Sequence, residues 1–441
     1  MSGRERIQVP KPRGAMSHKR TALVAALDIG SSKIACMIAR MKPCAPSDAL
    51  RGRTHAIELI GYSQIQSRGV KAGAVVDLNA CEQAVRQAVA LAERMANVRV
   101  ESVLLSLSAG RLHGQLIEAA ADVHGSTVSQ SDVVRITSTG MHHATPAGRS
   151  ALHVLPVSYS LDGVKGIRDP RGMVARQFGV DMNVVTAEAT AAKNLMLVVQ
   201  RCHLDIEAMA ASPYVAGLAV LTDDDTDVGA AVVDLGAGTT TIAAFSGGRF
   251  VHASGFALGG QHITMDLARG IGACIADAER IKTLYGTVLA GGSDAREMMQ
   301  IPAASDDERD APHLVSRATV TNIIRQRAEE IFEMVRDRLA DSPFAAEPRA
   351  GVVLTGGGSQ LTGLPELASQ ILGRNVRVGR PLGFGRLPAE AKSASFAVPA
   401  GLLVYPQFVH LEHIEPRHTR QLKTGTGGYF GKVGQWLREG F

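Results

Sequence analysis

Two apolar runs in the chain, residues 23–27 and 228–233, each lead to an aspartate that is followed by glycine, small hydroxyl residues and a second apolar run. The first copy reads Asp28-Ile29-Gly30-Ser31-Ser32-Lys33, and the second reads Asp234-Leu235-Gly236-Ala237-Gly238-Thr239-Thr240-Thr241. A short apolar run that stops at a turn signal is typical of a buried strand. The pattern therefore predicts a strand-turn-strand hairpin in each half of the chain.

The residue types in these hairpins suit an anion. Glycine lets backbone N–H groups approach a phosphate closely, hydroxyl side chains add further donors, and the aspartate would face a cation held by that phosphate. A single hairpin of this kind more often only reverses the chain. Two copies, each opening about half of the molecule, favour two related lobes that face one nucleotide.

Helical periodicity is clearest between Leu78 and Met95, where Asp77 is placed to cap the helix. Residues 98–183 alternate between apolar and polar positions instead, which indicates an inserted subdomain, and the boundary between the lobes is expected at Ser212-Pro213. The other predicted elements are strands at 57–62, 103–107, 151–159 and 351–355, and helices at 187–201, 276–282, 318–339 and 364–372.

Three further groups of residues have a structural and a functional interpretation. Asp223-Asp224-Asp225 is expected at a solvated hairpin tip rather than in a metal site, because nothing brings these carboxylates together. Glu279 and Lys282 are three apart on one helix face and would form a surface ion pair unless they meet a ligand. Three glycines at 356–358 follow a buried strand and weaken regular structure, which favours close approach to an adenosine over a flexible turn.

Composition narrows the function classes. The chain has 441 residues, of which 45% are hydrophobic and 20% charged, as in ordinary globular proteins of two or more domains. Its net charge of +5 is carried by the basic residues of the first twenty positions, so the body offers no nucleic-acid surface. Five scattered cysteines favour reduced thiols, and neither a signal peptide nor a membrane-spanning run is expected.

The last residues predict a membrane anchor. Residues 429–441 contain the only tryptophan of the chain and follow a polar, glycine-bearing segment, 411–428. At about 100° per residue their apolar side chains fall on one face of a helix of about 20 Å, too short to span a bilayer but suited to lie in its interface. The side chains expected to insert are Phe430, Val433, Trp436, Leu437 and Phe441. The alternative is a terminal helix packed on the protein itself.

Together the two hairpins, the glycine loop Thr355–Ser359 and the segment Ala397–Gly401 resemble the actin, sugar-kinase and heat-shock chaperone ATPase superfamily. Within it the chain is similar to the FtsA family of bacterial cell-division proteins over residues 21–441. Stretches specific to that family are Ser67-Arg68-Gly69 with Lys71 and Gly73, Asp277-Ala278-Glu279 with Lys282, and Val353–Gly357.

The resemblance implies an α/β, two-lobed, actin-like ATPase fold with a subdomain called 1C inserted in the first lobe. The implied division is a disordered basic arm, 1–20; subdomain 1A, 21–97 with 184–211 and 398–410; 1C, 98–183; 2A, 212–260 with 348–397; 2B, 261–347; a flexible linker, 411–428; and the amphipathic membrane-targeting helix, 429–441.

The resemblance also implies a site for ATP and Mg²⁺. Asp28 and Asp234 would face the metal, usually through water. The implied nucleotide-binding residues are Gly30, Ser31, Ser32, Lys33, Gly236, Ala237, Gly238, Thr239, Thr240, Gly260, Glu279, Lys282, Gly356, Gly357 and Gly358. No general base can be named near Thr186–Thr190, where this chain has alanines at positions that are often amide or acidic in relatives, so ATP hydrolysis is expected to be weak or absent and the catalytic residues are unknown.

The partners follow from the same resemblance. The acidic C-terminal peptide of the tubulin-like protein FtsZ would dock on 2B at Arg317, Asn322 and Arg327, 1C would contact a neighbouring protomer in a filament and further division proteins, and the tail would bind lipid. The expected function is to tether FtsZ to the cytoplasmic face of the inner membrane at the division site. The alternatives are a PilM-like scaffold of type IV pilus assembly, which shares the 1C insertion, and a small-molecule kinase, which would need a substrate pocket and a base.

Overall fold

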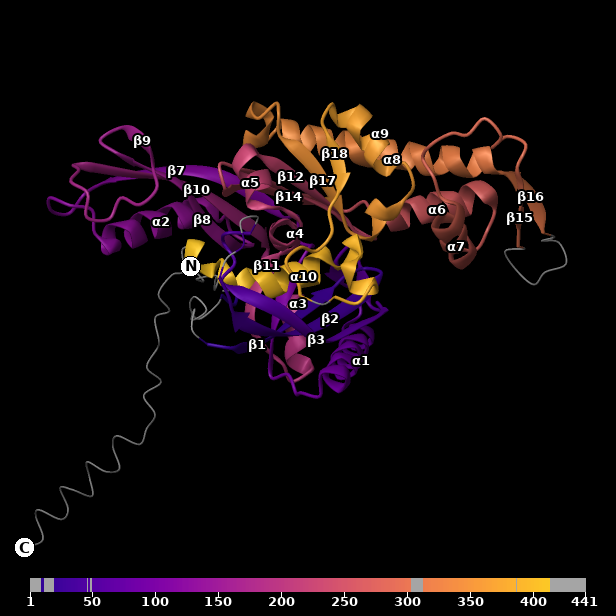
Figure 1. Cartoon of the computed structure of the whole chain (residues 1–441), viewed down its shortest axis with the longest axis horizontal. Coiled ribbons are helices and arrows are strands. Elements are labelled where there is room, and N and C mark those ends of the chain that lie inside the picture. Colours follow the sequence, from indigo (N-terminus) through magenta and orange to yellow (C-terminus); the bar gives the residue numbers. More distant parts are fainter. Residues whose placement is uncertain are drawn as a thin grey trace, which may run out of the picture.

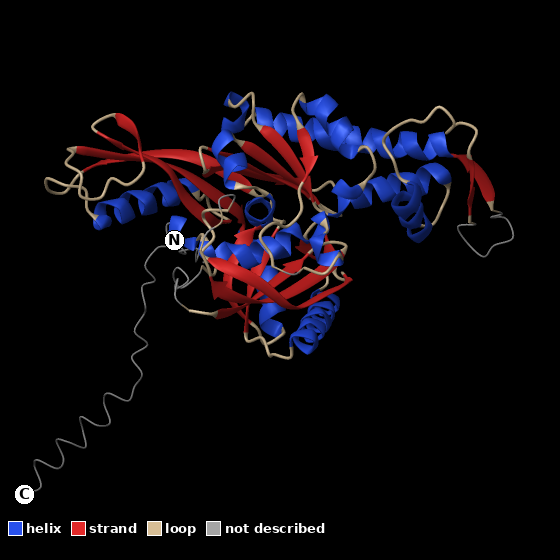
Figure 2. Ribbon diagram, in the orientation of Figure 1, coloured by secondary structure: helices blue, strands red, loops and turns tan. Residues whose placement is uncertain are grey.

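The computed structural model describes residues 9–11, 20–45, 47, 50–302, 312–385 and 387–412 of the chain. Most of the basic N-terminal arm, nearly all of the predicted linker and the whole amphipathic tail lie outside these residues. None of the helices within the described ranges combines the length and the apolar character needed to cross a membrane. Figures 1 and 2 show two bodies of sheet and helix, one above the other in this view.

The first lobe is built on a five-stranded sheet in the order β11-β6-β1-β2-β3. β1 pairs with β2 in antiparallel fashion and with β6 in parallel fashion, and β6 pairs in parallel with β11. The strands are β1 (Ala22–Ile29), β2 (Lys33–Pro43), β3 (His55–Gln66), β6 (Ser102–Leu107) and β11 (Asp205–Ala211); a small hairpin of β4 (Val70–Lys71) and β5 (Ala74–Val75) follows β3.

Two helices of the first lobe confirm the predicted helical periodicity. α1 (Leu78–Ala96) packs on β2 and β3 through a stripe of small apolar side chains, and Asp77 caps it by accepting the backbone N–H groups of Asn79 and Ala80. α3 (Ala189–Arg201) lies beside α1 and begins two residues later than predicted, because Ala187 and Glu188 still belong to a strand.

The sequence pattern predicts that the strand at 103–107 belongs to the inserted subdomain. In the structure this strand, β6, belongs to the sheet of the first lobe, where it lies between β1 and β11. Its last five residues are all buried, which is the pattern of a strand covered on both faces in a parallel arrangement rather than of a half-exposed antiparallel strand.

The second sheet has nine strands, in the order β18-β17-β12-β13-β14-β7-β10-β8-β9. The strands are β7 (His113–Asp122), β8 (Arg149–Leu161), β9 (Val164–Ile167), β10 (Gln177–Glu188), β12 (Ala230–Leu235), β13 (Thr240–Ser246), β14 (Arg249–Phe256), β17 (Gly351–Thr355) and β18 (Val376–Val378). The insert supplies β7 to β10 and the helix α2 (Gln130–Ala144), and one pair, His113 with Ser254, joins its strands to those of the second lobe.

The second lobe adds a helical region that covers one face of its strands. This region comprises α6 (Gly260–Ile271), α7 (Ile275–Tyr285), α8 (Arg317–Ala340), α9 (Leu364–Leu372), and a hairpin of β15 (Met298–Ile301) and β16 (His313–Ser316). The predicted helices at 276–282, 318–339 and 364–372 are therefore confirmed. In Figure 1 the insert and the hairpin at the end of α8 extend to opposite sides of the molecule.

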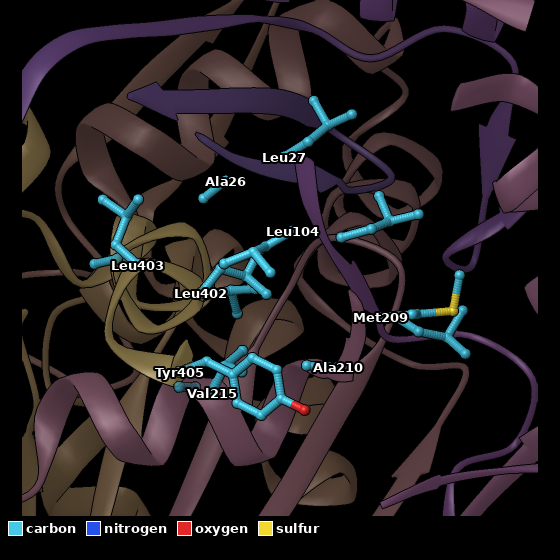
Figure 3. Packing of buried hydrophobic residues seen from close by; sticks show 14 of the residues in the cluster. Ala26, Leu27, Leu104, Met209, Ala210, Val215, Leu402, Leu403 and Tyr405 are labelled. Carbon is cyan, nitrogen blue, oxygen red and sulfur yellow. The ribbon is translucent and has the colours of Figure 1, made fainter. Parts of the chain in front are cut away.

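The lobes share a core built on two apolar helices, α4 (Ser212–Val220) and α10 (Ala397–Val404). They cross so closely at Gly401 that a Cβ there would lie 1.8 Å from the carbonyl oxygen of Val215. Figure 3 shows Leu402 and Leu403 of α10 among side chains of β1 and β6. Short 3-10 helices complete the described chain: η1 (Pro343–Ala346), η2 (Gly357–Gln360), η3 (Glu390–Lys392), η4 (Ala394–Phe396), η5 (Tyr405–Gln407) and η6 (Val409–Leu411).

The aspartate run at 223–225 is helical, so the expected hairpin tip is wrong. These residues form the first turn of α5 (Asp223–Val228), where Asp225 and Thr222 make a capping box. Carboxylates are favoured in a first turn because they face the unpaired N–H groups and the positive end of the helix dipole. Local helix chemistry accounts for the run.

Candidate nucleotide-binding site

The two predicted hairpins are confirmed and have the same internal geometry. In the first, the N–H of Gly30 donates to the carbonyl of Lys33 at 3.0 Å, and in the second, the N–H of Gly236 donates to the carbonyl of Thr239 at 2.9 Å. Each returning strand then pairs with the first in antiparallel fashion. Asp28 and Asp234 consequently occupy the same position, two residues before the glycine of the turn.

The hairpins also meet each other. A Cβ at Gly238 would lie 2.5 Å from Ser31 Oγ and 3.0 Å from the Cα of Ala72, so only glycine fits there. Ser31 Oγ in turn accepts the N–H of Gly73 at 2.8 Å. The predicted loop around residues 67–73 therefore supports the first hairpin where it touches the second.

Asp28 is held by a residue that the sequence analysis missed. The Ser106 hydroxyl, on the neighbouring strand β6, donates to Asp28 Oδ1 at 2.5 Å. Burial raises the pKa of Asp28, and the Ser106 hydrogen bond and the Lys33 ammonium oppose that rise. A signal for Ser106 is present in the sequence, because it lies near the end of the apolar run at 103–107. If that run pairs in parallel with the run that ends at Asp28, both ends lie at the same edge of the sheet.

Asp234 is the more perturbed carboxyl. It is 9% exposed, and burial together with the charge of Asp28 raises its pKa to about 7, while Lys33 opposes the rise. Two carboxyl groups close enough to affect each other, away from water, favour a cation between or beside them. Within the described ranges no larger cluster of metal-ligating side chains occurs, so this pair is the candidate cation site.

Lys33 reaches from the first lobe to the segment that leads into α10. Its Nζ donates to the carbonyl of Ser395 at 2.6 Å and lies 4.1 Å from the centre of the Phe396 ring. Burial lowers the pKa of Lys33 to about 8, against the pull of Asp28 and Asp234. A partly desolvated ammonium of this kind suits a phosphate, and neither Ser395 nor Phe396 carries a local signal in the sequence.

The start of α6 packs directly on the second hairpin. The N–H groups of Gly260 and Gln261 donate to the carbonyls of Gly236 and Ala237 at 2.9 and 2.8 Å. A Cβ on Gly259 would lie 2.5 Å from the carbonyl oxygen of Gly236. These first two N–H groups of the helix therefore fix the turn, and Thr240 strengthens the junction by donating to the carbonyl of Leu258 at 2.8 Å.

Glu279 and Lys282 of α7 form the expected ion pair, within a network tied to α6. Lys282 Nζ lies 2.7 Å from Glu279 Oε2, 2.7 Å from Thr264 Oγ1 and 3.0 Å from the carbonyl of Gly260. Thr264 also donates to Glu279. The network places both charged side chains next to the start of α6, and contact with a ribose or base stays a prediction.

The triple glycine lies against Asp234. Gly356 has φ +82°, and a Cβ there would lie 2.3 Å from Asp234 Oδ1. A Cβ on Gly358 would lie 3.0 Å from the carbonyl of Leu235, whereas at Gly357 the nearest atom is 3.9 Å away. Packing against the second hairpin thus explains two of the three glycines, and Gly357 has room for a ligand on the same turn.

The other predicted functional residues lie apart from the hairpins or outside the described chain. Arg317 pairs with Glu297 at 2.9 Å, and Arg327 pairs with Asp266 of α6 at 2.5 Å and with Glu330. Asn322 is exposed on the same helix, α8. Near Thr186–Thr190, the Glu188 carboxylate lies 3.5 Å from Arg111. The five tail residues predicted to bind lipid lie beyond residue 412.

Comparison with known proteins gives two family matches. The model described as "Cell division protein FtsA" matches residues 231–401, and the model described as "SHS2 domain inserted in FTSA" matches residues 109–186. The second range agrees with the strands and helix of the insert and begins after β6.

Relatives in other bacteria match this chain over almost their whole length. It is 48% identical to the cell division protein FtsA of Agrobacterium fabrum, covering 97% of this chain and 96% of the relative. The identity to FtsA of Rhizobium meliloti is 47% (96% of each chain), and to FtsA of Escherichia coli K12 it is 28% (95% and 98%).

Solved structures show the same fold at low identity. The chain is similar to a protein of the PilM-PilN type IV pilus biogenesis complex with a TM-score of 0.62 at 17% identity, covering 87% of this chain and 98% of the other. For MreB5 of Spiroplasma citri bound to ADP, the TM-score is 0.52 at 14% identity, covering 88% of this chain and 97% of the other. The fold is therefore that of the actin-like ATPases, with an SHS2 domain inserted. Because relatives named FtsA match almost the entire chain at up to 48% identity, the chain belongs to the FtsA family of cell division proteins.

Proposed function

We propose that this protein binds ATP with Mg²⁺ between its two hairpins, polymerises, and tethers FtsZ to the cytoplasmic face of the inner membrane at the division site, where it recruits later division proteins. Its role in cell division follows from its family. The observation that carries the finer proposal is the doubled hairpin, which brings Asp28, Asp234 and Lys33 together from two lobes.

Nucleotide binding is supported by the chemistry of these groups. Backbone N–H groups and hydroxyls of the two turns would meet phosphate oxygens, and the Lys33 ammonium would contribute positive charge. Of the structures with this fold, that of MreB5 is described as bound to ADP. Hydrolysis is expected to be weak, because the charged side chain in the 186–190 segment, Glu188, faces Arg111.

The two carboxyl groups fit a divalent cation. Both Asp28 and Asp234 have a raised pKa owing to burial, so positive charge beside them would remove an electrostatic penalty. Mg²⁺ prefers oxygen ligands and keeps several waters, so it would offset the phosphate charge from that position. Ser106 would hold the Asp28 carboxylate in a fixed orientation, and Gly356 leaves room for the Asp234 carboxylate.

FtsZ binding would use arginines of α8 that already form ion pairs with carboxylates of this chain. The Arg327 guanidinium already pairs with Asp266 and Glu330, and Arg317 pairs with Glu297. An acidic peptide would therefore have to displace or share these carboxylates, so modest affinity is expected. A charge reversal at Arg327 would lose both the cation and its hold on α6.

Membrane attachment is assigned to the tail. Five apolar side chains buried in an interface would contribute an upper limit of about 7–15 kcal/mol before the cost of ordering the helix, so one tail would bind weakly. Many tails on one filament would bind firmly through their effective concentration. Attachment would therefore depend on assembly.

The experiment is co-sedimentation of the full chain with anionic phospholipid vesicles, with and without MgATP and a fluorescent FtsZ C-terminal peptide. Deleting residues 428–441 should abolish sedimentation and leave ATP binding intact. Lys33→Met should weaken ATP binding at least about tenfold. Lys42→Met should not, because Lys42 lies at the far end of β2 and loses only an exposed pair with Glu58 of β3.

The peptide is the third readout. Arg327→Glu should abolish peptide capture, whereas Arg336→Glu, which loses only its pair with the adjacent Asp337, should retain it. Sedimentation of the truncated chain would contradict the anchor. Absence of peptide binding in the unaltered protein would favour the PilM-like alternative, and phosphotransfer from ATP to a small substrate would favour a kinase.

A further inference from the structure

The two lobes also meet at the ends of their sheets that lie away from the hairpins. β2 leaves the first hairpin at Lys33 and ends at Pro43, so at about 3.3 Å per residue the segment 44–54 begins about 35 Å from that hairpin. α5 immediately precedes β12, which places α5 at the end of that strand remote from Asp234. Residues of these two segments touch each other.

Arg51 makes the polar contacts to α5. Its guanidinium lies 2.9 Å from Asp227, 3.5 Å from Asp224 and 3.6 Å from Asp223, and its backbone N–H also donates to Asp223. Asp224 and Asp227 are 86% and 55% exposed, so these pairs are hydrated and exchange partners readily. They form the adjustable part of the contact.

Arg53, two residues later, is buried in the second lobe. It is 5% exposed, and its guanidinium donates to the carbonyls of Leu218 at 2.9 Å and of Leu382. Gly383 has φ +76°, and a Cβ there would lie 2.2 Å from Arg53 Nη1, so only glycine fits. Burial lowers the pKa of Arg53 to about 10, with Asp223 opposing, so the group stays charged at neutral pH. Withdrawing it would leave two carbonyls without their donor.

The arginine segment is fixed to its own lobe as well. Gln407 Oε1 accepts the N–H groups of Thr54 at 2.8 Å and His55 at 2.9 Å. Ile57, further along β3, bridges Phe384, the residue after Gly383, and so adds a further contact between the lobes. A rigid support on the first-lobe side means that relative movement of the lobes must be taken up where Arg51 and Arg53 meet the second lobe.

We propose that Arg51 and Arg53, together with α5 and Gly383, form a clasp that is the pivot between the lobes, so that the hairpins separate by rotation about the clasp. The hairpin contact of Ser31 with Gly238 leaves no space for a side chain, so a phosphate that enters between the turns must part them. With the remote ends held by Arg53, the lobes rotate, and the exposed pairs of Arg51 rearrange. This inference rests on the proposed nucleotide site.

The test compares two charge reversals of similarly exposed arginines. Arg51→Glu opposes three carboxylates across the lobes, whereas Arg40→Glu disturbs only Glu58 on the next strand of the same lobe. We expect Arg51→Glu to release mant-ADP about fivefold faster and to raise hydrogen exchange in residues 50–54 and 223–228 by about the same factor. Arg51→Glu with Asp227→Arg restores one pair and should recover both values.

The two readouts separate the clasp from the nucleotide site. Release and exchange that match those of Arg40→Glu overturn the proposal, and so does faster exchange at the clasp with unchanged mant-ADP release. If mant-ADP does not bind the unaltered protein, the proposed function fails. Hydrogen exchange of the hairpins at 30–33 and 236–239 then decides alone, and unchanged protection there in Arg51→Glu overturns the pivot.

Discussion

At the scale of single residues, the shape of the site depends on glycines at positions that have no space for a side chain. Gly238 faces Ser31 across the lobes, and Gly356 faces the carboxylate of Asp234. Ser31 belongs to the first hairpin and Asp234 to the second, and both face the proposed ligand. An added methyl group at either glycine would therefore push one of these ligand-facing side chains out of place. Close approach of backbone explains these glycines better than flexibility does.

Gly356→Ala tests this, with Gly373→Ala as a control for backbone strain in the left-handed helical region. Both glycines have positive φ, +82° and +63°, but Gly373 has ψ 30° and a Cβ there meets nothing within 4 Å, whereas Gly356 has ψ 170° and a Cβ there meets Asp234. The control should lose about 1 kcal/mol of unfolding free energy from backbone strain, and Gly356→Ala about 1–3 kcal/mol more, because its backbone conformation is almost restricted to glycine and because its Cβ collides with Asp234. Urea denaturation of both variants measures the difference; equal losses would mean that neither the collision nor the conformation at Gly356 has an added cost.

The sequence could predict the aspartates and glycines because a hairpin is a local structure. The Gly30 and Gly236 bonds each span three residues, so the motif carries its own geometry. Ser106, Ser395 and Phe396 could not be predicted in this way, because they reach the site from other strands or from the far end of the chain. A single sequence shows residue types in order and does not show which distant segments pair.

At the scale of elements, periodicity predicted helices well and misjudged two short runs. α1 lies where its apolar spacing and the Asp77 cap indicate, and α9 lies at its predicted residues, since a helix buries one stripe whatever it packs on. β6 belongs to the first lobe and not to the insert, because its paired strands β1 and β11 and the helix α10 that packs on it lie far away in sequence. The aspartates of α5 form a helical turn and not a hairpin tip, and the capping pair of Thr222 and Asp225 is a local signal for that helix start. Only their contact with Arg51, 172 residues before Asp223, has no local signal.

The junction of β14 with the insert contains a buried histidine with a pH consequence. His252 is 8% exposed, and burial, then the nearby His113 and Arg338, lower its pKa to about 4, while Asp341 opposes. The unfolded chain takes up this proton near pH 6.5 and the folded chain does not. Burial of His252 therefore has no effect on the free energy of unfolding through this proton above about pH 6.5. Below that pH the free energy of unfolding decreases as the pH falls toward 4.

His252→Leu should remove this loss. The free energy of unfolding of the unaltered protein should fall relative to that of the variant by up to about 1.4 kcal/mol for each pH unit between about 6.5 and 4. Urea denaturation of both proteins at about pH 7 and about pH 5 measures the change. A difference between them that does not vary with pH would mean that His252 is protonated in the folded state.

At the scale of the whole molecule, three distant segments converge on one buried pair. His153 of the insert and Glu412 are both fully buried, with Nδ1 and Oε1 2.9 Å apart. The N–H of Ala211, just before α4, donates to His153 Nε2 at 2.8 Å, so the imidazole carries its proton on Nδ1 and donates it to the carboxylate. The rings of Tyr214 and Tyr405 pack against it edge-on.

Breaking this pair from one side should be costly. His153→Leu removes the His153 donor from the buried Glu412 carboxyl and leaves the N–H of Ala211 without its acceptor, so we expect a loss of about 3 kcal/mol of unfolding free energy. His153→Leu with Glu412→Leu removes both polar groups and should recover much of it. Thermal denaturation of the single and double variants measures the effect; a double variant less stable than the single one would show that Glu412 has another essential contact.

The nine-stranded sheet has a consequence for the order in which the protein can be made. Its neighbouring strands β12 and β17 are more than a hundred residues apart in the chain, whereas the strands of the insert, which continue the sheet beyond β14, are made first, from β7 at His113 onward. On the ribosome, β12, β13 and β14 must therefore wait with an open edge until residue 355 emerges. The apolar residues of β12 make that edge prone to aggregation, so the nascent chain is expected to depend on chaperones until synthesis passes β17.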